Sequence, residues 1–309
     1  MLAPGPTDNR RVTIIGRSTG VFAILGIIVV LGSVLGGFAM AHGPFAVLLA
    51  WSEWVVIVGT AVGTVLISTP KSVLGHLTKK IPRVFTGAAP SKEGYLDVLR
   101  LLFELFQLAR RDGLIAIESH IERPEESSVF KKYPSISNDH HAVEFLCDAL
   151  RTVLAGSVPA YDLEAMLEAE IEVHHDEDAK TVAALTRVAD ALPGIGIVAA
   201  VLGIVVTMQA IAGPIEEIGH HVASALVGTF LGILLSYGFV APIATAVETQ
   251  NGESHRIFLV LKAGIVAFAK NLPPIIASEF ARKAITADTR PTFAEMEAAC
   301  KATRQEKAA

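Results

Sequence analysis

The sequence contains little cysteine and none of the short motifs that mark common enzyme sites. Its two cysteines, Cys147 and Cys300, lie in no recognisable spacing, so neither a disulfide framework nor a zinc site is indicated. The phosphate-binding GxxxxGKS/T, nucleophile-elbow GxSxG and zinc-binding HExxH patterns do not occur. We therefore predict no catalytic residues, no metal and no cofactor. A formal net charge of −5 gives no reason to expect nucleic acid as a partner.

Aromatic residues are also scarce, at 6%, whereas hydrophobic residues make up 51% of the 309-residue chain and glycines number 25. Together with a mean hydropathy of +0.49, this composition is typical of a protein with several membrane spans. Charged residues, at 18%, are too frequent for a protein that lies wholly in the membrane, so a sizeable aqueous part is expected. The first apolar run lacks a clear cleavage site and is interpreted as a retained span.

Four apolar runs are each long enough to cross a hydrocarbon core, which takes about 20 residues of helix. A helix is expected because backbone groups in lipid must be paired within the segment. The predicted fold is an all-α polytopic membrane protein with four transmembrane helices and a large helical domain between the second and third. The four expected spans are Val21–Ala41, Phe45–Ile67, Pro193–Ala212 and Val222–Val247.

Lysine and arginine are distributed asymmetrically around these spans. The loops at 42–44 and 213–221 lack them, whereas the N-terminal segment, the stretch after span two and the C-terminal tail carry them. Because basic residues favour the cytoplasmic side, we expect both termini and the middle section in the cytoplasm. The expected divisions are 1–20 (cytoplasmic N-terminal segment), 21–69 (spans one and two), 70–190 (cytoplasmic helical domain), 191–247 (spans three and four) and 248–309 (cytoplasmic C-terminal tail).

Apolar residues repeat at helical spacing in the middle section and in the tail. The longest such stretch, Asp162–Asp190, is acidic and runs into Pro193, so we expect span three to continue out of the membrane as a stalk. The tail should pack against this acidic helix, because the aqueous part needs a core of its own. Further helices are expected at Tyr95–Leu108, Leu114–Ile121, Ala142–Leu154 and Glu253–Ile285, the last broken at Pro273 and Pro274.

Prolines and closely spaced small residues distinguish spans three and four from plain anchors. Pro193 lies at the start of its apolar run, where a helix tolerates it. Pro242 lies inside its run and should kink or locally open the helix, freeing the carbonyl of Gly238. The GxxxG pattern at 228–232 lets helix backbones approach closely. A tightly packed helix pair without a transport role would explain these residue types equally well.

Acidic and basic residues are missing from the depth of spans three and four, which offer only hydroxyl groups such as Thr207 and Thr229. If these spans carry protons, a second polypeptide must bring the titrating group. Glu53 lies early in span two, between Trp51 and Trp54. Tryptophans favour the membrane interface, so Glu53 is either a carboxylate near headgroup depth or a proton-access or inter-subunit group.

Long stretches of the sequence resemble the MotA family, the A subunits of the bacterial flagellar motor stator. The likeness is strongest in LPGIGIVAAVLGIV at 192–205, ALVGTFLGILLSYGFVAPIAT at 225–245 and PPIIASEFARK at 273–283, and it covers nearly the whole chain. The resemblance implies an inner-membrane subunit that couples proton flow to torque on the rotor. It also implies a homo-oligomer, a pentamer in the family picture, around a dimer of a B subunit (MotB) whose span bears an aspartate.

Residues of the ion pathway are carried over from this resemblance position by position. The family's functional prolines fall on Pro193 and Pro242, and its channel-facing threonine falls on Thr229. Sodium-driven relatives carry a threonine where Ala200 stands, so the missing hydroxyl favours protons here. The chain departs from many proton-driven members at Val206, where they carry histidine.

The family's rotor-facing charges, which would meet the switch protein FliG, fall on Arg110 and Glu118, with Glu170 a further acidic match. From residue type alone, the first two are ordinary surface charges, which are worth little per exposed pair. Two other functions stay open. One is an energy-transducing subunit of the ExbB/TolQ type, which resembles this chain only in spans three and four, and the other is a membrane scaffold that conducts no ions.

Overall fold

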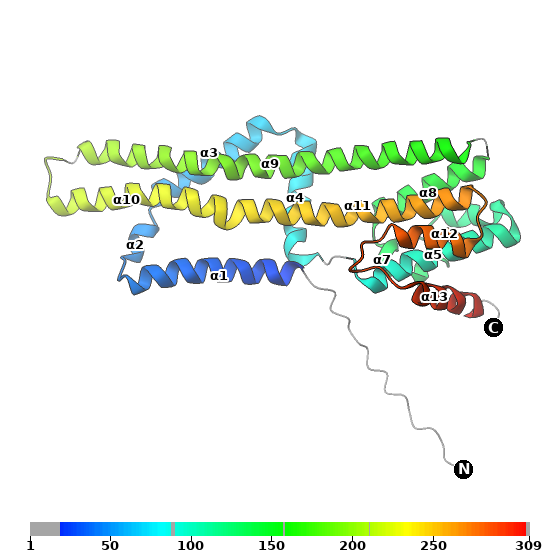
Figure 1. The fold of residues 1–309 in the computed structure, drawn as a ribbon. Helices are drawn as coiled ribbons and strands as arrows, with labels where there is room; N and C mark the ends of the chain where they lie inside the picture. The colour runs from blue at the N-terminus through cyan, green and yellow to red at the C-terminus, as the bar shows by residue number, and fades with distance from the viewer. Residues whose placement is uncertain (1–18, 88–89, 157, 210, 307–309) are drawn as a thin grey trace, which may run out of the picture.

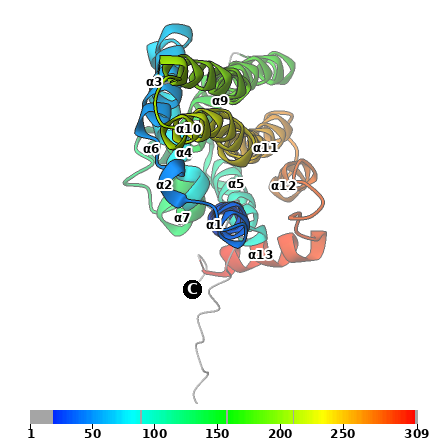
Figure 2. The same ribbon diagram turned by 90° about the vertical axis from the view of Figure 1, so that its left-hand side faces the viewer.

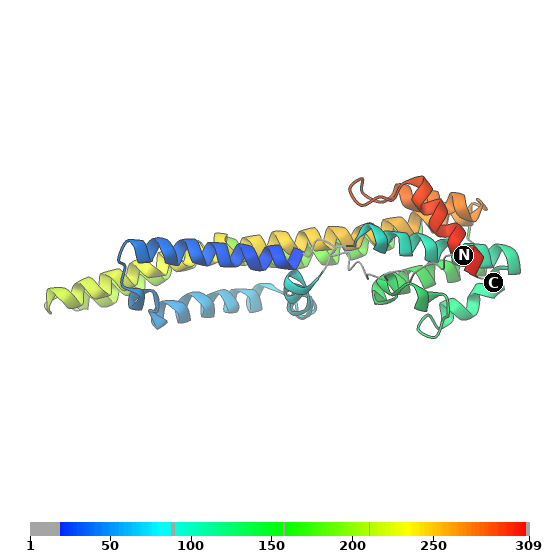
Figure 3. The same ribbon diagram turned by 90° about the horizontal axis from the view of Figure 1, so that it is seen from below.

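The computed structural model describes residues 19–87, 90–156, 158–209 and 211–306, and these are mostly helical. Long helices run side by side along the molecule, and shorter helices gather at one end (Figure 1, Figure 3). The 3₁₀-helices are η1 (Leu114–Ile117) and η2 (Phe130–Lys132), and η3 (Leu234–Val240) is a π-helix. The α-helices are α1 (Thr19–Met40), α2 (Phe45–Leu48), α3 (Trp51–Ser68), α4 (Lys71–Thr86), α5 (Lys92–Asp112), α6 (Glu118–Glu122), α7 (Pro134–Ser137), α8 (His140–Ala155), α9 (Ala160–Gln209), α10 (Ile215–Ile233), α11 (Ala241–Ala269), α12 (Pro274–Lys283) and α13 (Phe293–Glu306).

Four helical stretches are long and apolar enough to cross a membrane, as the sequence predicts. They are Gly20–Met40, Phe45–Ser68 and the apolar parts of Ala160–Gln209 and Ile215–Ala269. The first of them, α1, contacts mainly α4 and η3. It stands to one side of the other spans when the molecule is viewed from its end (Figure 2).

Span three and the acidic stretch before it form one helix, α9, of 50 residues. At about 1.5 Å per residue this helix is about 75 Å long. The predicted stalk is therefore confirmed. The expectation that Pro193 stands in a first helical turn is wrong, because the helix begins 33 residues earlier, at Ala160, and Pro193 lies inside it. The expected divisions after 190 and 247 fall within the continuous helices α9 and α11.

The second span departs from the single helix expected over Phe45–Ile67. Helix α2 ends at Leu48 and α3 begins only at Trp51. The indole Nε1 of Trp54 donates a hydrogen bond to the carbonyl of Leu48 at 3.3 Å, which gives a partner to one carbonyl at the broken helix end. The expectation of one unbroken helix is wrong here, although the whole stretch remains a candidate span.

Helix α4 follows the second span, where the sequence analysis expects only a basic stretch. Pro82 lies inside this helix and helps to hide its pattern. Buried apolar residues of α4, including Leu77, pack against α9 and α11. The ammonium of Lys80 binds the carboxylate of Asp178 and, at 2.7 Å, Oδ1 of Asn251. Helix α4 thus ties both long helices together where the apolar spans end (Figure 1).

The helical head is the group formed by α5 to α8, α12, α13 and the adjoining ends of α9 and α11 (Figure 1). It encloses the largest apolar core of the chain. The ring of Phe106 on α5 stacks on that of Phe268 on α11, with centroids 4.4 Å apart. Lys270, the C-cap residue of α11, pairs with Glu164 of α9 at 2.9 Å. The predicted packing of the tail against the acidic helix is therefore confirmed.

Helix ends in the head follow from residue type. The hydroxyl of Ser91 accepts a hydrogen bond from the amide of Gly94 at 3.1 Å, which caps the start of α5. Gly113 ends α5 with φ of +90°, and Gly156 ends α8 with φ of +67°. Residues with a side chain rarely adopt such angles, so glycine is needed at both ends. The separation predicted between the helices at Tyr95–Leu108 and Leu114–Ile121 is therefore confirmed.

A buried guanidinium holds the C-terminal end of α12. Arg282 is 7% exposed, and its Nε and Nη2 each donate to a carboxylate oxygen of Glu279 at 2.6 Å. Its Nη1 donates to the carbonyl of Pro291 at 2.8 Å. The hydrogen bonds from Arg282 lower the pKa of Glu279. This pair therefore fastens the loop after α12 to the head.

We expect Glu279→Gln to lower the free energy of unfolding by about 1.5–3 kcal/mol near neutral pH, the range for hydrogen bonds to a charged group. The folded-state pKa of Glu279 lies below the unfolded value, so the stabilisation is complete above the unfolded pKa and is lost as pH falls through the folded one. Thermal unfolding of the purified chain at pH 7 and pH 3 measures both effects. Glu297→Gln, which removes the more exposed pair with Lys301, should change little. An equal loss for Glu279→Gln at both pH values would contradict this account.

Candidate functional site

Spans three and four pack against each other through glycines. A Cβ added at Gly196 would lie 2.8 Å from the carbonyl oxygen of Gly228. One added at Gly232 would lie 2.7 Å from the carbonyl oxygen of Leu192. Real Cβ atoms do not approach backbone atoms so closely, so α9 and α10 are in direct backbone contact. The close approach predicted from the GxxxG pattern at 228–232 is confirmed.

A π-helical turn, η3, lies immediately before Pro242. The amide of Ala241 donates to the carbonyl of Ser236, five residues back instead of four. Such wider turns accommodate a break in the regular bonding of a helix. The local opening predicted near Pro242 is therefore confirmed and takes the form of this π turn. Pro242 also lines an apolar cavity of about 450 Å³ between α1 and η3–α11.

The other proline, Pro193, is half-buried inside α9. Because proline has no amide hydrogen, the carbonyl of Ala189 cannot receive the usual bond from four residues ahead. The hydroxyl of Ser236 donates to this carbonyl at 2.6 Å, across the contact between the two spans. The sequence-based prediction misses Ser236, because a serine in an apolar run that also holds Ser224 does not reveal a partner on the other span.

Ala200 and Thr229 lie close together at the contact between α9 and α10. A Cβ on Gly228, which precedes Thr229, would lie 3.1 Å from the backbone nitrogen of Ala200. Both residues are half-buried in the single chain. Thr207, farther along α9, donates its hydroxyl to the carbonyl of Gly203 at 2.8 Å within its own helix. Of the hydroxyl groups noted in the sequence, Thr229 is thus the one beside Ala200.

Glu53 lies in the first turn of α3 and is 5% exposed. Its Oε2 is buried and has no hydrogen-bond partner within the part of the chain that the structure describes. This oxygen would lie 2.6 Å from a Cβ on Gly228, so the carboxyl group touches the backbone of α10. An unpaired carboxylate is costly in such surroundings. The structure places Glu53 against the hairpin formed by spans three and four (α9 and α10), next to Ala200 and Thr229.

One face of α9 is apolar and uncovered along its membrane-spanning half. Its side chains recur at helical spacing, and each is at least half exposed. A continuous row of exposed apolar side chains of this kind marks a contact with lipid or with another polypeptide. The residues of this face are Ile197, Val198, Val201, Leu202 and Val205.

The charges singled out in the head lie on three different elements. Arg110 is exposed at the end of α5 and donates from Nη1 to the carbonyl of Asn271 at 3.0 Å. Glu118 is exposed at the start of α6. Glu170 is half-buried on α9, and burial raises its pKa, as do the nearby carboxylates of α8. Arg110 and Glu118 lie close together in the chain, on either side of Gly113 and the 3₁₀-helix η1. Glu170 belongs to the stalk part of α9.

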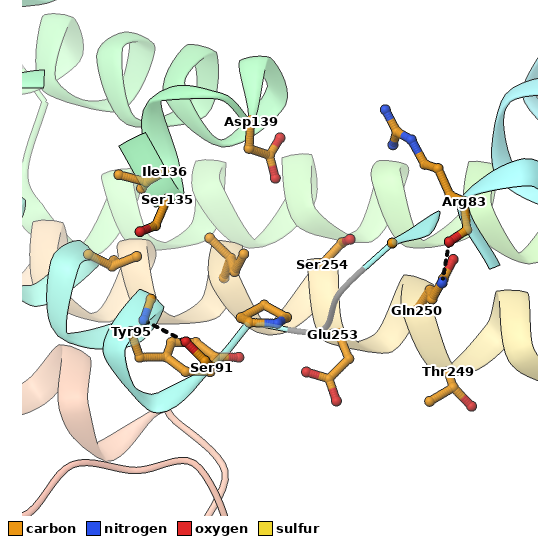
Figure 4. Close-up of a pocket in the computed structure, with 15 residues that line it drawn as sticks. Arg83, Ser91, Tyr95, Ser135, Ile136, Asp139, Thr249, Gln250, Glu253 and Ser254 are labelled. Atoms are coloured by element: carbon orange, nitrogen blue, oxygen red, sulfur yellow. Dashed lines mark hydrogen bonds between the residues drawn. The ribbon is translucent and has the colours of Figure 1, made fainter. Parts of the chain in front are cut away.

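A second cavity, of about 390 Å³, lies between the start of the head, α4 and α11 (Figure 4). Its lining mixes charges of both signs, from Arg83, Asp139 and Glu253. At its edge the side-chain amide of Gln250 donates to the carbonyl of Arg83 at 2.9 Å. Within the described ranges, no group of three or more histidine, cysteine, aspartate or glutamate side chains is placed to hold a metal ion.

Two family patterns match the sequence. The one described as Motility protein A N-terminal matches residues 24–113, and the one described as the MotA/TolQ/ExbB proton channel family matches residues 137–258. Together they cover both pairs of spans and part of the head.

Similar proteins extend over nearly the full length of the chain. The Chemotaxis protein LafT of Vibrio parahaemolyticus is 39% identical over 88% of this chain and 96% of its own length. Motility protein A of Salmonella typhimurium is 36% identical over 91% of this chain and 95% of its own length. Motility protein A of Escherichia coli is also 36% identical, over 89% of this chain and 93% of its own length.

Two solved structures share the fold. The structure of C. jejuni MotAB matches with a TM-score of 0.71 at 20% identity, over 87% of this chain and 96% of that one. The flagellar MotAB stator complex from Bacillus subtilis matches with a TM-score of 0.69 at 21% identity, over 86% of this chain and 96% of that one.

Proposed function

The chain belongs to the MotA family of flagellar motility proteins, and we propose that it is the ion-conducting A subunit of a flagellar motor stator. In this function it couples proton flow through a complex with a B subunit to torque on the rotor. The pattern match at residues 24–113 favours this function over an ExbB/TolQ-type subunit, because it is specific to motility protein A. The family pattern at 137–258 is that of a channel, and we propose no enzymatic activity for the chain.

The observation that supports the proposal most is the construction of the hairpin. Spans three and four are in backbone contact at glycines, α9 carries Pro193 inside its helix, and a π turn precedes Pro242 in span four. Neither span carries an acidic or basic residue between Pro193 and Gln209 or between Val222 and Val240. Such a pair can change its bend but cannot itself hold a titrating proton at mid-membrane. The titrating acid would therefore come from the B subunit.

The uncovered apolar face of α9 supports an assembly around such a partner. We propose a homo-oligomer, a pentamer by family resemblance, that surrounds a MotB dimer and is otherwise bathed in membrane lipid. Pro193 and Pro242 would permit the change of bend, and Thr229 and Ala200 would lie along the ion pathway. Glu53, buried beside them without a partner among the described residues, would serve proton access or a contact between subunits.

The head would face the rotor. We place both termini and the head in the cytoplasm and the spans in the inner membrane, because lysine and arginine flank the spans on that side only. Arg110, Glu118 and Glu170 would then meet the switch protein FliG. Exposed charges of this kind steer an encounter more than they tighten it, so their contribution should fall as ionic strength rises.

The choice of ion gives a direct test. When the chain and its B subunit are expressed in cells that lack their own stator, we expect swimming to persist without sodium and to stop within seconds of adding a protonophore. The reason is that Ala200 offers no hydroxyl group to coordinate a bare cation. Swimming speed in tracked cells is the measurement, and a sodium-driven stator in the same host is the control. Swimming that requires sodium would reverse the ion assignment, and no swimming in any medium would overturn the function itself.

A further inference from the structure

Ser236 links the two prolines of spans three and four. Its side chain reaches the helix that contains Pro193, and its backbone belongs to the π turn ahead of Pro242. Neither role follows from the sequence pattern of a membrane span, since a single serine is common in such helices.

The first contact involves the carbonyl that Pro193 leaves open. Ala189 lies four residues before Pro193, so its carbonyl oxygen lacks the regular helical donor. The hydroxyl of Ser236 supplies a donor at 2.6 Å. Because Ser236 is 0% exposed, water does not compete for this bond, and the carbonyl would otherwise be a buried acceptor without its helical donor.

The second contact lies on the backbone of the same residue. The carbonyl of Ser236 accepts the amide hydrogen of Ala241, the residue just before Pro242, and this bond closes the π turn. If η3 returned to regular α-helical bonding, the backbone around Ser236 would rotate and its hydroxyl would move away from Ala189. The π turn and the capped carbonyl therefore depend on each other.

The packing around this bond leaves the hydroxyl little freedom. Gly232, one turn before Ser236, is pressed against the backbone of α9, where an added Cβ would lie 2.8 Å from the Cα of Gly196. The two helices are thus held at close range on one side of Ser236. A small movement of either helix along its axis would break the hydrogen bond.

We propose that Ser236 is a positioning residue for torque generation, because its hydroxyl joins the turn of α9 that precedes Pro193 to the π turn before Pro242 so that both move as one unit. The proposal rests on the proposed function as a stator subunit. One net hydrogen bond corresponds to a roughly two- to tenfold shift in an equilibrium. Ser236→Ala should therefore reduce the torque delivered by each engaged stator unit by a factor of that order.

Torque per unit is measured on single motors with a bead attached to the flagellar filament, as units are recruited one by one to a motor that begins without any. Counting the units with a fluorescent B subunit separates a loss of torque from a loss of assembly. The control is Thr249→Val, which removes a hydroxyl whose hydrogen bond lies within its own helix, to the carbonyl of Thr245 at 2.9 Å. We expect Thr249→Val to match the unmodified chain and Ser236→Ala to lower torque per unit at a normal unit count.

A double-mutant cycle tests the hydrogen bond itself. In Pro193→Ala the new amide can donate to Ala189, so the serine hydroxyl is no longer needed there. In the purified complex, Ser236→Ala should lower the thermal midpoint on its own but not in the Pro193→Ala background.

The torque measurement and the double-mutant cycle together test the role of Ser236. Unchanged torque per unit in Ser236→Ala overturns the proposal even if the cycle shows the bond. If Ser236→Ala fails to assemble, the cycle decides, and an equal loss of midpoint in both backgrounds overturns the proposal. If the unmodified chain restores no rotation, the proposed function fails instead, and that result is separate from the behaviour of Ser236→Ala.

Discussion

A Pro242→Ala chain should reach the membrane and assemble, yet leave cells almost unable to swim. Alanine restores the missing amide hydrogen and removes the ring that crowds the preceding turn, which together favour a regular helix by about 3 kcal/mol. That is on the order of a hundredfold shift in the balance between an opened and a closed helix. The π turn of η3 should then be lost, and with it the ability of span four to change its bend. Swimming speed and stator counts at the motor measure the two effects separately.

Pro214→Ala is the matched control for this variant. Pro214 lies at the N-terminal cap of α10, in the same hairpin, with φ of −62° and ψ of 142°. An amide hydrogen at this position has no helical partner to bond, so the substitution should leave swimming unchanged. Normal swimming by Pro242→Ala cells would show that the opened helix is not needed for motor function.

The second large effect is expected from Gly232→Ala. The added methyl group would lie 2.7 Å from the carbonyl oxygen of Leu192 and 2.8 Å from the Cα of Gly196, both backbone atoms that cannot rotate away. The two spans must separate, and overpacking of this kind costs about 1–3 kcal/mol. We expect a fall in the thermal midpoint of the purified complex of roughly 5 °C, by the usual relation between stability and midpoint, together with a loss of swimming.

Gly252→Ala provides the comparison for this packing effect. Gly252 is an exposed helical glycine of α11, and an added Cβ there would meet nothing within 4 Å in the described chain. Alanine favours a helix over glycine by about 1 kcal/mol, so this variant should be as stable as the unmodified chain or slightly more so. If both substitutions lowered the midpoint equally, the close backbone contact between spans three and four would be in question.

Much of the fold could be predicted from the sequence because its main constraints are local. Four apolar runs were each long enough to span a membrane, which gave the number of spans. Gly113 and the prolines at 273 and 274 marked helix ends. The break between α2 and α3 was not predicted, because the residues around it carry no helix-end signal; the structure pairs the Trp54 indole with the carbonyl of Leu48, six residues back, at this point. Helix α4 was hidden by an internal proline and by basic residues whose partners, such as Asp178, lie far away in the sequence.

Part of the candidate site could also be predicted from the sequence. Pro242 and the GxxxG pattern pointed to a bend and to close packing, and both are present in the structure. The contact of Glu53 with α10 and the bond from Ser236 to Ala189 were out of reach. Each joins residues that are distant in the chain, and neither residue type is unusual enough to reveal its partner.

The unbroken course of α9 also determines how far a local change at Pro193 would travel. From Pro193 to the start of the helix at Ala160 the distance along the axis is about 50 Å, at about 1.5 Å per residue. A change of about 10° in the bend would therefore swing the far end of this arm by roughly 9 Å, which exceeds the rise of one helical turn. A small change of angle inside the membrane would thus displace the head by several ångströms, because the rigid helix transmits the rotation along its whole length.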